Sequence, residues 1–204
     1  KEAGVSTLAA RKIWYDDTVR RLNTDQRGQL LGEFKGDDQI LTINSDGTYK
    51  LLGFDLSTHF SEEMIHIEKL NTEKPVSAVY WDGDKEQFNV KRFLIEATKR
   101  NMLFITEHEN SYLEIASTEW KPVIEIVFRK TKGKEKEPKK IDIDNFISIK
   151  GLKAIGKRLT TEKVKMINIL DPLPTPEKET APKNEEISAD DTEDSPTQVK
   201  IDFE

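Results

Sequence analysis

The chain has 204 residues, of which 35% are hydrophobic and 34% are charged, with a mean hydropathy of −0.66. This composition supplies enough apolar material for one modest core, and no run of about 18 apolar residues offers a membrane-spanning helix. The sequence contains no cysteine. Disulfides, thiolate nucleophiles and sulfur-ligated zinc are therefore excluded, and we expect a cytoplasmic protein.

The net charge of −6 conceals a segregation along the chain. Residues 1–128 hold 16 Lys and Arg against 22 Asp and Glu, residues 129–170 hold 13 against 5, and residues 171–204 hold 3 against 11. The middle segment is strongly basic and the last segment strongly acidic. Such a pair is typical of a polyanion-binding surface beside a segment able to compete for it.

Before residue 171, apolar residues recur mostly at every second position, which is typical of β-strands. Two hairpins are predicted, residues 39–43 with 48–52 and residues 76–81 with 87–93. Each turn contains an Asp-Gly pair, which favours tight turns because glycine accepts a positive φ. Further predicted elements are a strand pair at 102–106 and 111–115, strands at 123–128 and 146–149, and single helical turns at 61–65 and 160–164.

Repetition narrows the predicted architecture. Residues 39–55 and 101–119 share the order apolar strand, polar turn, Tyr-containing strand and acidic residue. Hairpin-sized units in series, each unable to bury its own face, favour blades of a propeller-like or solenoid array, with an immunoglobulin-like sandwich as the alternative. The predicted fold class is all-β.

From Asp171 onward the chain is rich in proline and acidic residues and has few large apolar side chains. Such a segment cannot bury enough surface to offset its ordering entropy, so residues 171–204 are predicted to form a disordered acidic tail. The alternative is that Val199–Phe203 pairs as a late strand or docks as a short linear motif.

No catalytic or metal site is predicted. The three histidines, His59, His66 and His108, lie in different segments, and no catalytic or cofactor-binding motif accompanies them. The acidic pairs resemble cation ligands only superficially, because turns and strand ends explain each of them and no full Ca²⁺ loop is present.

Clusters of cations recur along the chain and are the candidate nucleic-acid contacts. Small residues between Lys150 and Arg158 would allow a close approach of the backbone to phosphates, which the cations would neutralise. The aromatic residues lie mostly in apolar runs and are expected in the core, so contacts to the DNA backbone are predicted in place of base stacking. The alternative is that these cations are solvated strand ends and loops. The predicted DNA-binding residues are Arg20, Arg21, Arg27, Lys91, Arg92, Lys99, Arg100, Lys150, Lys153, Lys157, Arg158 and Lys163.

Several blocks carry a family resemblance: Ser6–Tyr15, Arg20–Asn23, Arg27–Leu41, Lys91–Phe93 and Phe146–Thr160. Together they resemble the C-terminal region of the A subunit in bacterial type IIA DNA topoisomerases, in the form found in topoisomerase IV or in proteins similar to the gyrase A subunit. The resemblance implies a β-pinwheel, a propeller-like ring of hairpin-built blades whose basic outer rim binds and bends duplex DNA for strand passage. Residues 1–170 would form a partial pinwheel of about three or four blades.

The resemblance also sets expectations for chemistry and partners. The family's cleavage tyrosine follows an arginine, and none of Tyr15, Tyr49, Tyr80 and Tyr112 does. The chain alone is therefore expected to be catalytically silent and to need no cofactor, as an accessory domain of an ATP-dependent enzyme whose ATP and Mg²⁺ sites lie on other domains or subunits.

The implied partners are double-stranded DNA, the topoisomerase B subunit, and the rest of the A subunit, with no membrane, at the bacterial nucleoid in the cytoplasm. The gyrase box rich in glutamine and glycine is missing, because Asp25–Gly28 is too short, and this favours topoisomerase IV. The alternative function is a non-catalytic, propeller-type scaffold for protein interaction.

Overall fold

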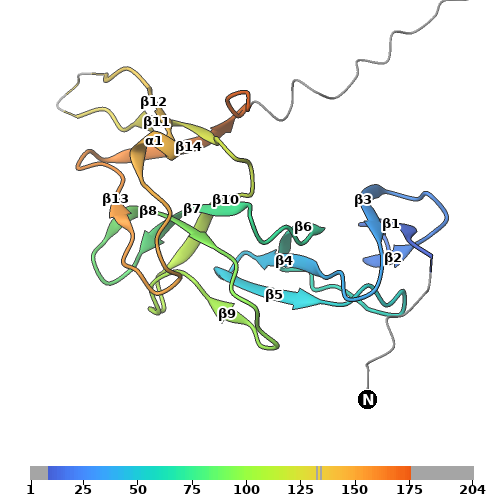
Figure 1. Ribbon diagram of the computed structural model, residues 1–204. Helices are drawn as coiled ribbons and strands as arrows, with labels where there is room; N and C mark the ends of the chain where they lie inside the picture. The colour runs from blue at the N-terminus through green and yellow to red at the C-terminus, as the bar shows by residue number, and fades with distance from the viewer. Residues whose placement is uncertain (1–8, 132, 134, 176–204) are drawn as a thin grey trace, which may run out of the picture. The chain divides into compact units, whose positions relative to one another are not determined.

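The computed structural model describes residues 9–131, 133 and 135–175 (Figure 1). These residues belong almost entirely to the first of two compact units, Lys1–Pro174. The predicted acidic tail lies outside the described residues except for positions 171–175, and so does its alternative strand at Val199–Phe203.

Within the described residues the protein consists of β-strands and one helical turn, α1 (Ile143–Phe146), which confirms the predicted all-β class. The strands are β1 (Arg11–Asp16), β2 (Arg21–Asn23), β3 (Gln29–Phe34), β4 (Ile40–Asn44), β5 (Thr48–Leu52), β6 (Met64–Lys69), β7 (Pro75–Asp82), β8 (Gln87–Leu94), β9 (Met102–Leu103), β10 (Tyr112–Ser117), β11 (Val123–Phe128), β12 (Lys139–Asp142), β13 (Lys157–Arg158) and β14 (Val164–Leu170).

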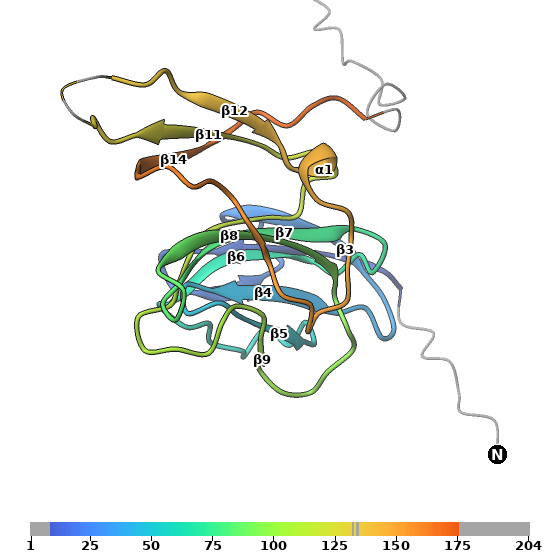
Figure 2. The same cartoon turned by 90° about the vertical axis from the view of Figure 1, so that its left-hand side faces the viewer.

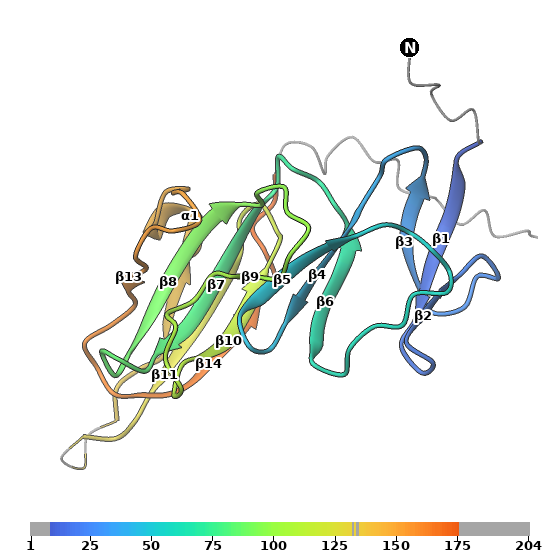
Figure 3. The same ribbon diagram turned by 90° about the horizontal axis from the view of Figure 1, so that it is seen from below.

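Four small antiparallel sheets follow one another along this part of the chain (Figure 3). Sheet 1 has the order β2-β1-β3, sheet 2 the order β6-β4-β5-β9, sheet 3 the order β10-β7-β8-β13 and sheet 4 the order β12-β11-β14. Each sheet contains a hairpin of two consecutive strands, which are β1–β2, β4–β5, β7–β8 and β11–β12. A third strand, which is β3, β6, β10 or β14 respectively, pairs with the first strand of the hairpin.

Neighbouring sheets exchange strands. The short strand β9 follows the hairpin of sheet 3 in sequence but pairs with β5 of sheet 2, and β13 follows the hairpin of sheet 4 but pairs with β8 of sheet 3. In sheet 1 the outer edge of the hairpin's second strand, β2, pairs only through a single bridge between Arg21 and His59 among the described residues. In sheet 4, no strand of the described residues pairs with the outer edge of β12.

Both predicted Asp-Gly hairpins are present as β4–β5 and β7–β8. In the first, Gly47 adopts a φ of 78° and donates its backbone N–H to the Asn44 carbonyl at 3.1 Å. Alternation of buried and half-buried side chains along β5 then places Tyr49 and Leu51 in the core.

Other local predictions are wrong. Residues 102–106 and 111–115 do not pair with each other, because β9 joins sheet 2 and β10 pairs with β7 of sheet 3. Residues 39–55 and 101–119 are therefore not equivalent units. Of the single turns expected at 61–65 and 160–164, the first forms, as a hydrogen-bonded turn in which the Met64 N–H donates to the Ser61 carbonyl at 3.3 Å, and β6 begins at Met64. Neither segment is helical, and β14 begins at Val164.

The helical turn that does form is α1, which takes up the start of the strand predicted at 146–149. The side chain of Asp142 caps it by accepting a hydrogen bond from the Asp144 N–H at 3.0 Å.

Three hydrophobic clusters fill the spaces between the sheets in the described part of the chain. Sheets 1 and 2 share a cluster containing Ile13, Phe34 and Ile40. A second cluster, between sheets 2 and 3, contains Tyr49 and Phe93. Sheets 3 and 4, which lie one above the other in Figure 2, share a third cluster that contains Val90 and Ile124. No described helix is long and apolar enough to cross a membrane.

Candidate nucleic-acid interface

Two of the predicted DNA contacts, Lys91 and Arg92, are buried at 7% and 4% exposure. The Lys91 ammonium donates a hydrogen bond to the Phe104 carbonyl at 2.9 Å, and burial lowers the pKa of this lysine. Arg92 binds the Asp144 carboxylate and donates to the Trp120 carbonyl at 2.6 Å. Neither side chain can reach a phosphate in this fold, so their burial contradicts the prediction and removes them from the candidate surface.

The remaining predicted cations are at the surface. Arg20 is half-buried and its guanidinium lies 3.9 Å from the Glu62 carboxylate. The exposed ones are Arg21, Arg27, Lys99, Arg100, Lys150, Lys153, Lys157, Arg158 and Lys163.

Arg27 stands on a loop between β2 and β3 that is organised by Asn23, which is itself buried. The Asn23 side chain accepts hydrogen bonds from the backbone N–H groups of Asp25 and Arg27 at 3.0 and 3.1 Å, and donates to the Arg27 carbonyl at 2.9 Å. Gly28 closes the loop with a φ of 81°, where a Cβ would lie 2.1 Å from the Tyr15 carbonyl oxygen. This loop therefore holds the Arg27 backbone in one conformation, and the exposed Arg27 guanidinium lies 3.4 Å from the Asp25 carboxylate.

The largest group of exposed cations among the predicted contacts lies on the segment from Lys150 to Lys163. The Lys150 N–H donates to the Arg92 carbonyl at 2.8 Å, and the buried Leu152 anchors the segment to the core. Gly156 packs so closely on sheet 3 that a Cβ there would lie 2.7 Å from the Tyr80 hydroxyl. This glycine therefore has a packing role, and with Leu152 it holds the backbone against the sheet while Lys153, Lys157 and Arg158 face outward.

Two of these cations are positioned by local contacts. The Lys157 ammonium donates to the Phe146 carbonyl at 2.9 Å and lies 4.2 Å from the centroid of the Phe146 ring. The Arg158 Nε donates to the Thr160 carbonyl at 3.0 Å, which leaves its terminal nitrogens available. No described acidic side chain forms a salt bridge with Lys150, Lys153, Lys157, Arg158 or Lys163.

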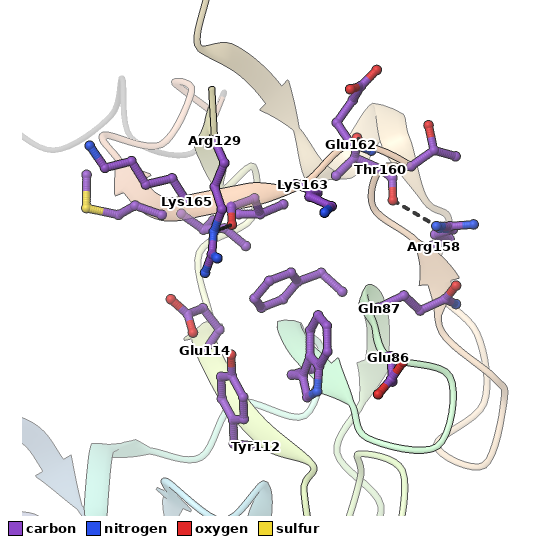
Figure 4. A pocket seen from close by; sticks show the side chains of 16 residues that line it. Glu86, Gln87, Tyr112, Glu114, Arg129, Arg158, Thr160, Glu162, Lys163 and Lys165 are labelled. Atoms are coloured by element: carbon purple, nitrogen blue, oxygen red, sulfur yellow. Dashed lines mark hydrogen bonds between the residues drawn. The ribbon is translucent and has the colours of Figure 1, made fainter. Parts of the chain in front are cut away.

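Arg158 and Lys163 also line a groove of about 830 Å³ between sheets 3 and 4 (Figure 4). Two further cations, Arg129 and Lys165, line the same groove. The sequence interpretation did not single out either residue, although both belong to the basic segment 129–170. The Arg129 Nε donates to the Val164 carbonyl at 3.1 Å, which fixes this arginine beside the start of β14.

Aromatic side chains form another wall of the groove. Trp81 stacks on Tyr112 with ring centroids 6.5 Å apart and meets Phe88 edge to face at 5.0 Å. Tyr112 is 44% exposed. Glu114 lies beside them, and partial burial raises the pKa of its carboxyl group. The expectation that Trp81 and Phe88 belong to the core therefore holds only in part, since both are half-buried at this groove.

The other predicted cations lie apart from this groove. Arg20, Arg21 and Arg27 belong to sheet 1 and its loops, and Lys99 and Arg100 lie in the connection between β8 and β9. Among the described residues, no group of three or more His, Cys, Asp or Glu is arranged to hold a metal ion.

Comparison with known proteins agrees with this architecture. The family model for the topoisomerase C-terminal domain of Bacteroidota matches residues 21–171. The crystal structure of the C-terminal domain of DNA topoisomerase IV superposes with a TM-score of 0.52 at 13% sequence identity. The match covers 80% of this chain and 62% of that one.

No curated protein matches the sequence significantly. At 13% identity the structural match establishes the fold, which confirms the predicted β-pinwheel. The family match spans most of the four sheets and of the cation-bearing segments described above. The chain therefore belongs to the family of bacterial topoisomerase C-terminal domains found in Bacteroidota.

Proposed function

We propose that this chain is the DNA-binding and DNA-bending C-terminal domain from the A subunit of a type IIA topoisomerase, and that it captures duplex DNA to guide strand passage. The observation that carries the proposal is the run of exposed cations from Lys150 to Lys163, which are free of acidic partners among the described residues. The contacting residues are Lys150, Lys153, Lys157, Arg158 and Lys163, with Arg129 and Lys165 from the neighbouring groove.

Electrostatic capture is the first step of the proposed mechanism. Cations fixed on packed backbone neutralise phosphates and release counterions without reading sequence. Bending a site of 20–30 bp costs on the order of 1–6 kcal/mol, so several contacts must act together. The additional contacts along a bent duplex would be Arg20, Arg21 and Arg27 of sheet 1 and its loops, with Lys99 and Arg100 of the connection between β8 and β9.

In this proposal the chain has no catalytic activity alone. The ATP and Mg²⁺ of the enzyme would be bound by other domains or subunits, and the protein partners would be the B subunit together with the remainder of the A subunit. The missing gyrase box favours topoisomerase IV over gyrase. The enzyme would act at the bacterial nucleoid in the cytoplasm.

The test is fluorescence anisotropy of the full chain with a non-specific duplex of about 40 bp across a salt series. If about six phosphates are contacted, affinity falls roughly a thousandfold between 50 and 200 mM salt. The double variant Lys153→Ala/Arg158→Ala should bind more weakly and reduce the salt slope by about two.

A matched control removes two exposed lysines at sheet 1, Lys12→Ala/Lys35→Ala, and should leave the slope unchanged. Equal slopes for both double variants would remove Lys153 and Arg158 from the interface. No binding even at low salt, together with salt-insensitive binding to a protein, would favour the alternative scaffold function.

A further inference from the structure

A row of aromatic side chains crosses sheet 3 at its groove with sheet 4. In the strand register Tyr112 of β10 lies opposite Trp81 of β7, and Trp81 lies opposite Phe88 of β8. Residues directly opposite each other in antiparallel strands point to the same face of the sheet, so the three rings share one face. The Trp81 and Tyr112 rings are nearly parallel, with an interplanar angle of 18°. The row therefore presents an aromatic surface three strands wide.

This row lies where the core between sheets 3 and 4 ends. Val79, two positions before Trp81 and on the same face of β7, is fully buried in the cluster shared with sheet 4. By contrast, Trp81 and Phe88 are half-buried and Tyr112 is 44% exposed. Sheet 4 therefore covers the aliphatic part of this face and leaves the aromatic row open to the groove.

Four cations surround the row. Arg129 directly follows β11 and Lys165 lies in β14, whereas Arg158 and Lys163 belong to the segment that leads into β14. Figure 4 shows Arg129 and Arg158 on opposite sides of the groove. Within the described part of the chain, none of the four forms a salt bridge.

The groove carries more positive than negative charge. Three glutamates also line it, but the carboxylate of Glu162 is neutralised by the Lys136 ammonium at 2.8 Å. Glu86 and Glu114 are left against the four cations. A groove with this excess attracts an anionic ligand.

Aromatic rings bordered by cations match the chemistry of unpaired nucleic acid. Every base has a flat face that stacks on an aromatic side chain, and the phosphates between the bases bind cations. A sheet face whose aromatic residues stack two or three bases is an established way of binding unpaired strands. In a paired duplex the base faces are covered by their neighbours, so the row can serve only bases that have left the helix.

The position of the groove indicates where such a strand would come from. Arg158 and Lys163 line the groove and also belong to the exposed cationic segment that is proposed to bind duplex phosphates. A strand that leaves the duplex at this segment would enter the groove directly. This continuity favours DNA over an acidic peptide, which would match the cations but has no such connection.

We infer that the groove between sheets 3 and 4 binds an unpaired stretch of DNA. Its bases stack on the row of Tyr112, Trp81 and Phe88, and its phosphates bind Arg129 and Arg158. The inference rests on the proposed function for the source of the strand. It adds a preference for locally unpaired DNA, which phosphate contacts alone do not provide.

The preference is measured by fluorescence anisotropy with the full chain. A fully paired duplex of about 40 bp is compared with the same duplex carrying a central bubble of about six mismatched pairs, so that the number of phosphates is equal. The wild type should bind the bubble at least about tenfold more tightly, because even one stacked base gives roughly this gain.

Variants separate stacking from the easier bending of a bubble. Tyr112→Ala should reduce the preference to less than about threefold, whereas Tyr112→Phe keeps the ring and should retain it. The matched control Ile65→Ala removes a 52% exposed apolar side chain of sheet 2 and should also retain it. An unchanged preference in Tyr112→Ala would overturn the inference and leave duplex binding, and with it the proposed function, intact.

Photocrosslinking locates the bases without a variant. A 5-iodouracil placed in the bubble should crosslink to Tyr112, Trp81 or Phe88, as mapped by mass spectrometry, and crosslinks confined to other residues would overturn the inference. Crosslinking at this row without any binding of the paired duplex would support the inference and reject the proposed function. Failure to bind either DNA would reject both, and Tyr112-dependent binding of a polyglutamate peptide would then assign the groove to an acidic peptide.

Discussion

Arg92 was predicted from sequence as a surface residue, but its side chain joins sheet 3 to the connection that leads into sheet 4. Its guanidinium binds Asp144 of α1 and the Trp120 carbonyl just before β11, while its own backbone belongs to β8. It therefore ties sheet 3 to the connection that leads into sheet 4. The planar guanidinium can satisfy two acceptors at once, which a lysine cannot do in the same geometry.

Replacing Arg92 with Ala should destabilise the fold. The loss removes two hydrogen bonds of a charged group, and because Asp144 keeps solvent contact the expected cost is about 2 kcal/mol. Urea denaturation would measure it. The exposed Arg100→Ala should change the free energy of unfolding by less than about 0.5 kcal/mol. Equal midpoints for the two variants would contradict the joining role.

The buried Lys91 should make the free energy of unfolding depend on pH in a specific way. Burial lowers its pKa below the ordinary value of 10.5, so the unfolded chain keeps this proton to higher pH than the folded chain does. At a pH below the folded-state pKa, the buried charge on Lys91 destabilises the folded state. As pH rises from the folded-state pKa towards 10.5, the folded chain has lost this proton and the unfolded chain still holds it, so the free energy of unfolding increases.

The variant Lys91→Met should lose that rising contribution while keeping a long, flexible side chain in the site. Urea midpoints measured from neutral pH up to about pH 10 would show a flatter profile than the wild type. Lys99→Met removes an exposed lysine and should keep the wild-type profile. Superimposable profiles for wild type and Lys91→Met would disprove the assignment.

At the scale of single elements, the β4–β5 turn does more than reverse the chain. Its Gly47 has a positive φ, contacts Ile105 and offers its carbonyl to the Phe104 N–H. The turn thus binds the segment that contains β9, which is the fourth strand of sheet 2. A Cβ at Gly47 would lie 2.5–2.9 Å from three Ile105 carbons, so both the turn and the added segment depend on this glycine.

Three glycine-to-alanine variants separate these effects. Gly47→Ala combines backbone strain with a clash and should cost about 2 kcal/mol. Gly36 has a φ of 53° but open space around it, so Gly36→Ala should lower the free energy of unfolding by about 1 kcal/mol through backbone strain alone. Gly53→Ala meets neither problem and should be neutral within about 0.5 kcal/mol. Any other order of the measured unfolding free energies would show that packing on Ile105 is not limiting.

The exchange of strands also predicts how the whole of the described unit unfolds. The strand β9 of sheet 2 lies in sequence between β8 and β10 of sheet 3, and β13 of sheet 3 lies between β12 and β14 of sheet 4. Neighbouring sheets therefore cannot separate without losing strands. We expect sheets 2, 3 and 4 to unfold in one cooperative transition.

Mild core substitutions at the two ends of that region test the expectation. Ile43→Val in sheet 2 and Ile124→Val in sheet 4 each remove one buried methylene and should cost about 1 kcal/mol. Calorimetry should show that each variant shifts the same single transition, with calorimetric and van't Hoff enthalpies equal. Two transitions, of which each variant shifts only one, would refute strand exchange as a source of cooperativity.

Local sequence patterns are sufficient to predict the features that depend on near neighbours along the chain. Alternating apolar residues predicted an all-β protein, and Asp-Gly turns located the β4–β5 and β7–β8 hairpins, because both signals act over a few residues. Strands without such a turn, including β3 and β14, were missed. The cations of the Lys150–Lys163 segment were also identified from sequence, and the structure places all five of them at the surface.

The partners of the short strands and the burial of individual cations depend instead on packing between distant parts of the chain. Met102–Thr106 and Ser111–Ile115 look like a hairpin in sequence, yet the backbone of β9 pairs with β5 and that of β10 with β7. Lys91 and Arg92 point to opposite faces of sheet 3, and both are buried because one face packs against sheet 2 and the other against sheet 4. Arg129 and Lys165 meet Arg158 only where sheets 3 and 4 adjoin. Pairing between distant segments leaves no local pattern, since a strand edge accepts any backbone and the choice rests on packing across sheets.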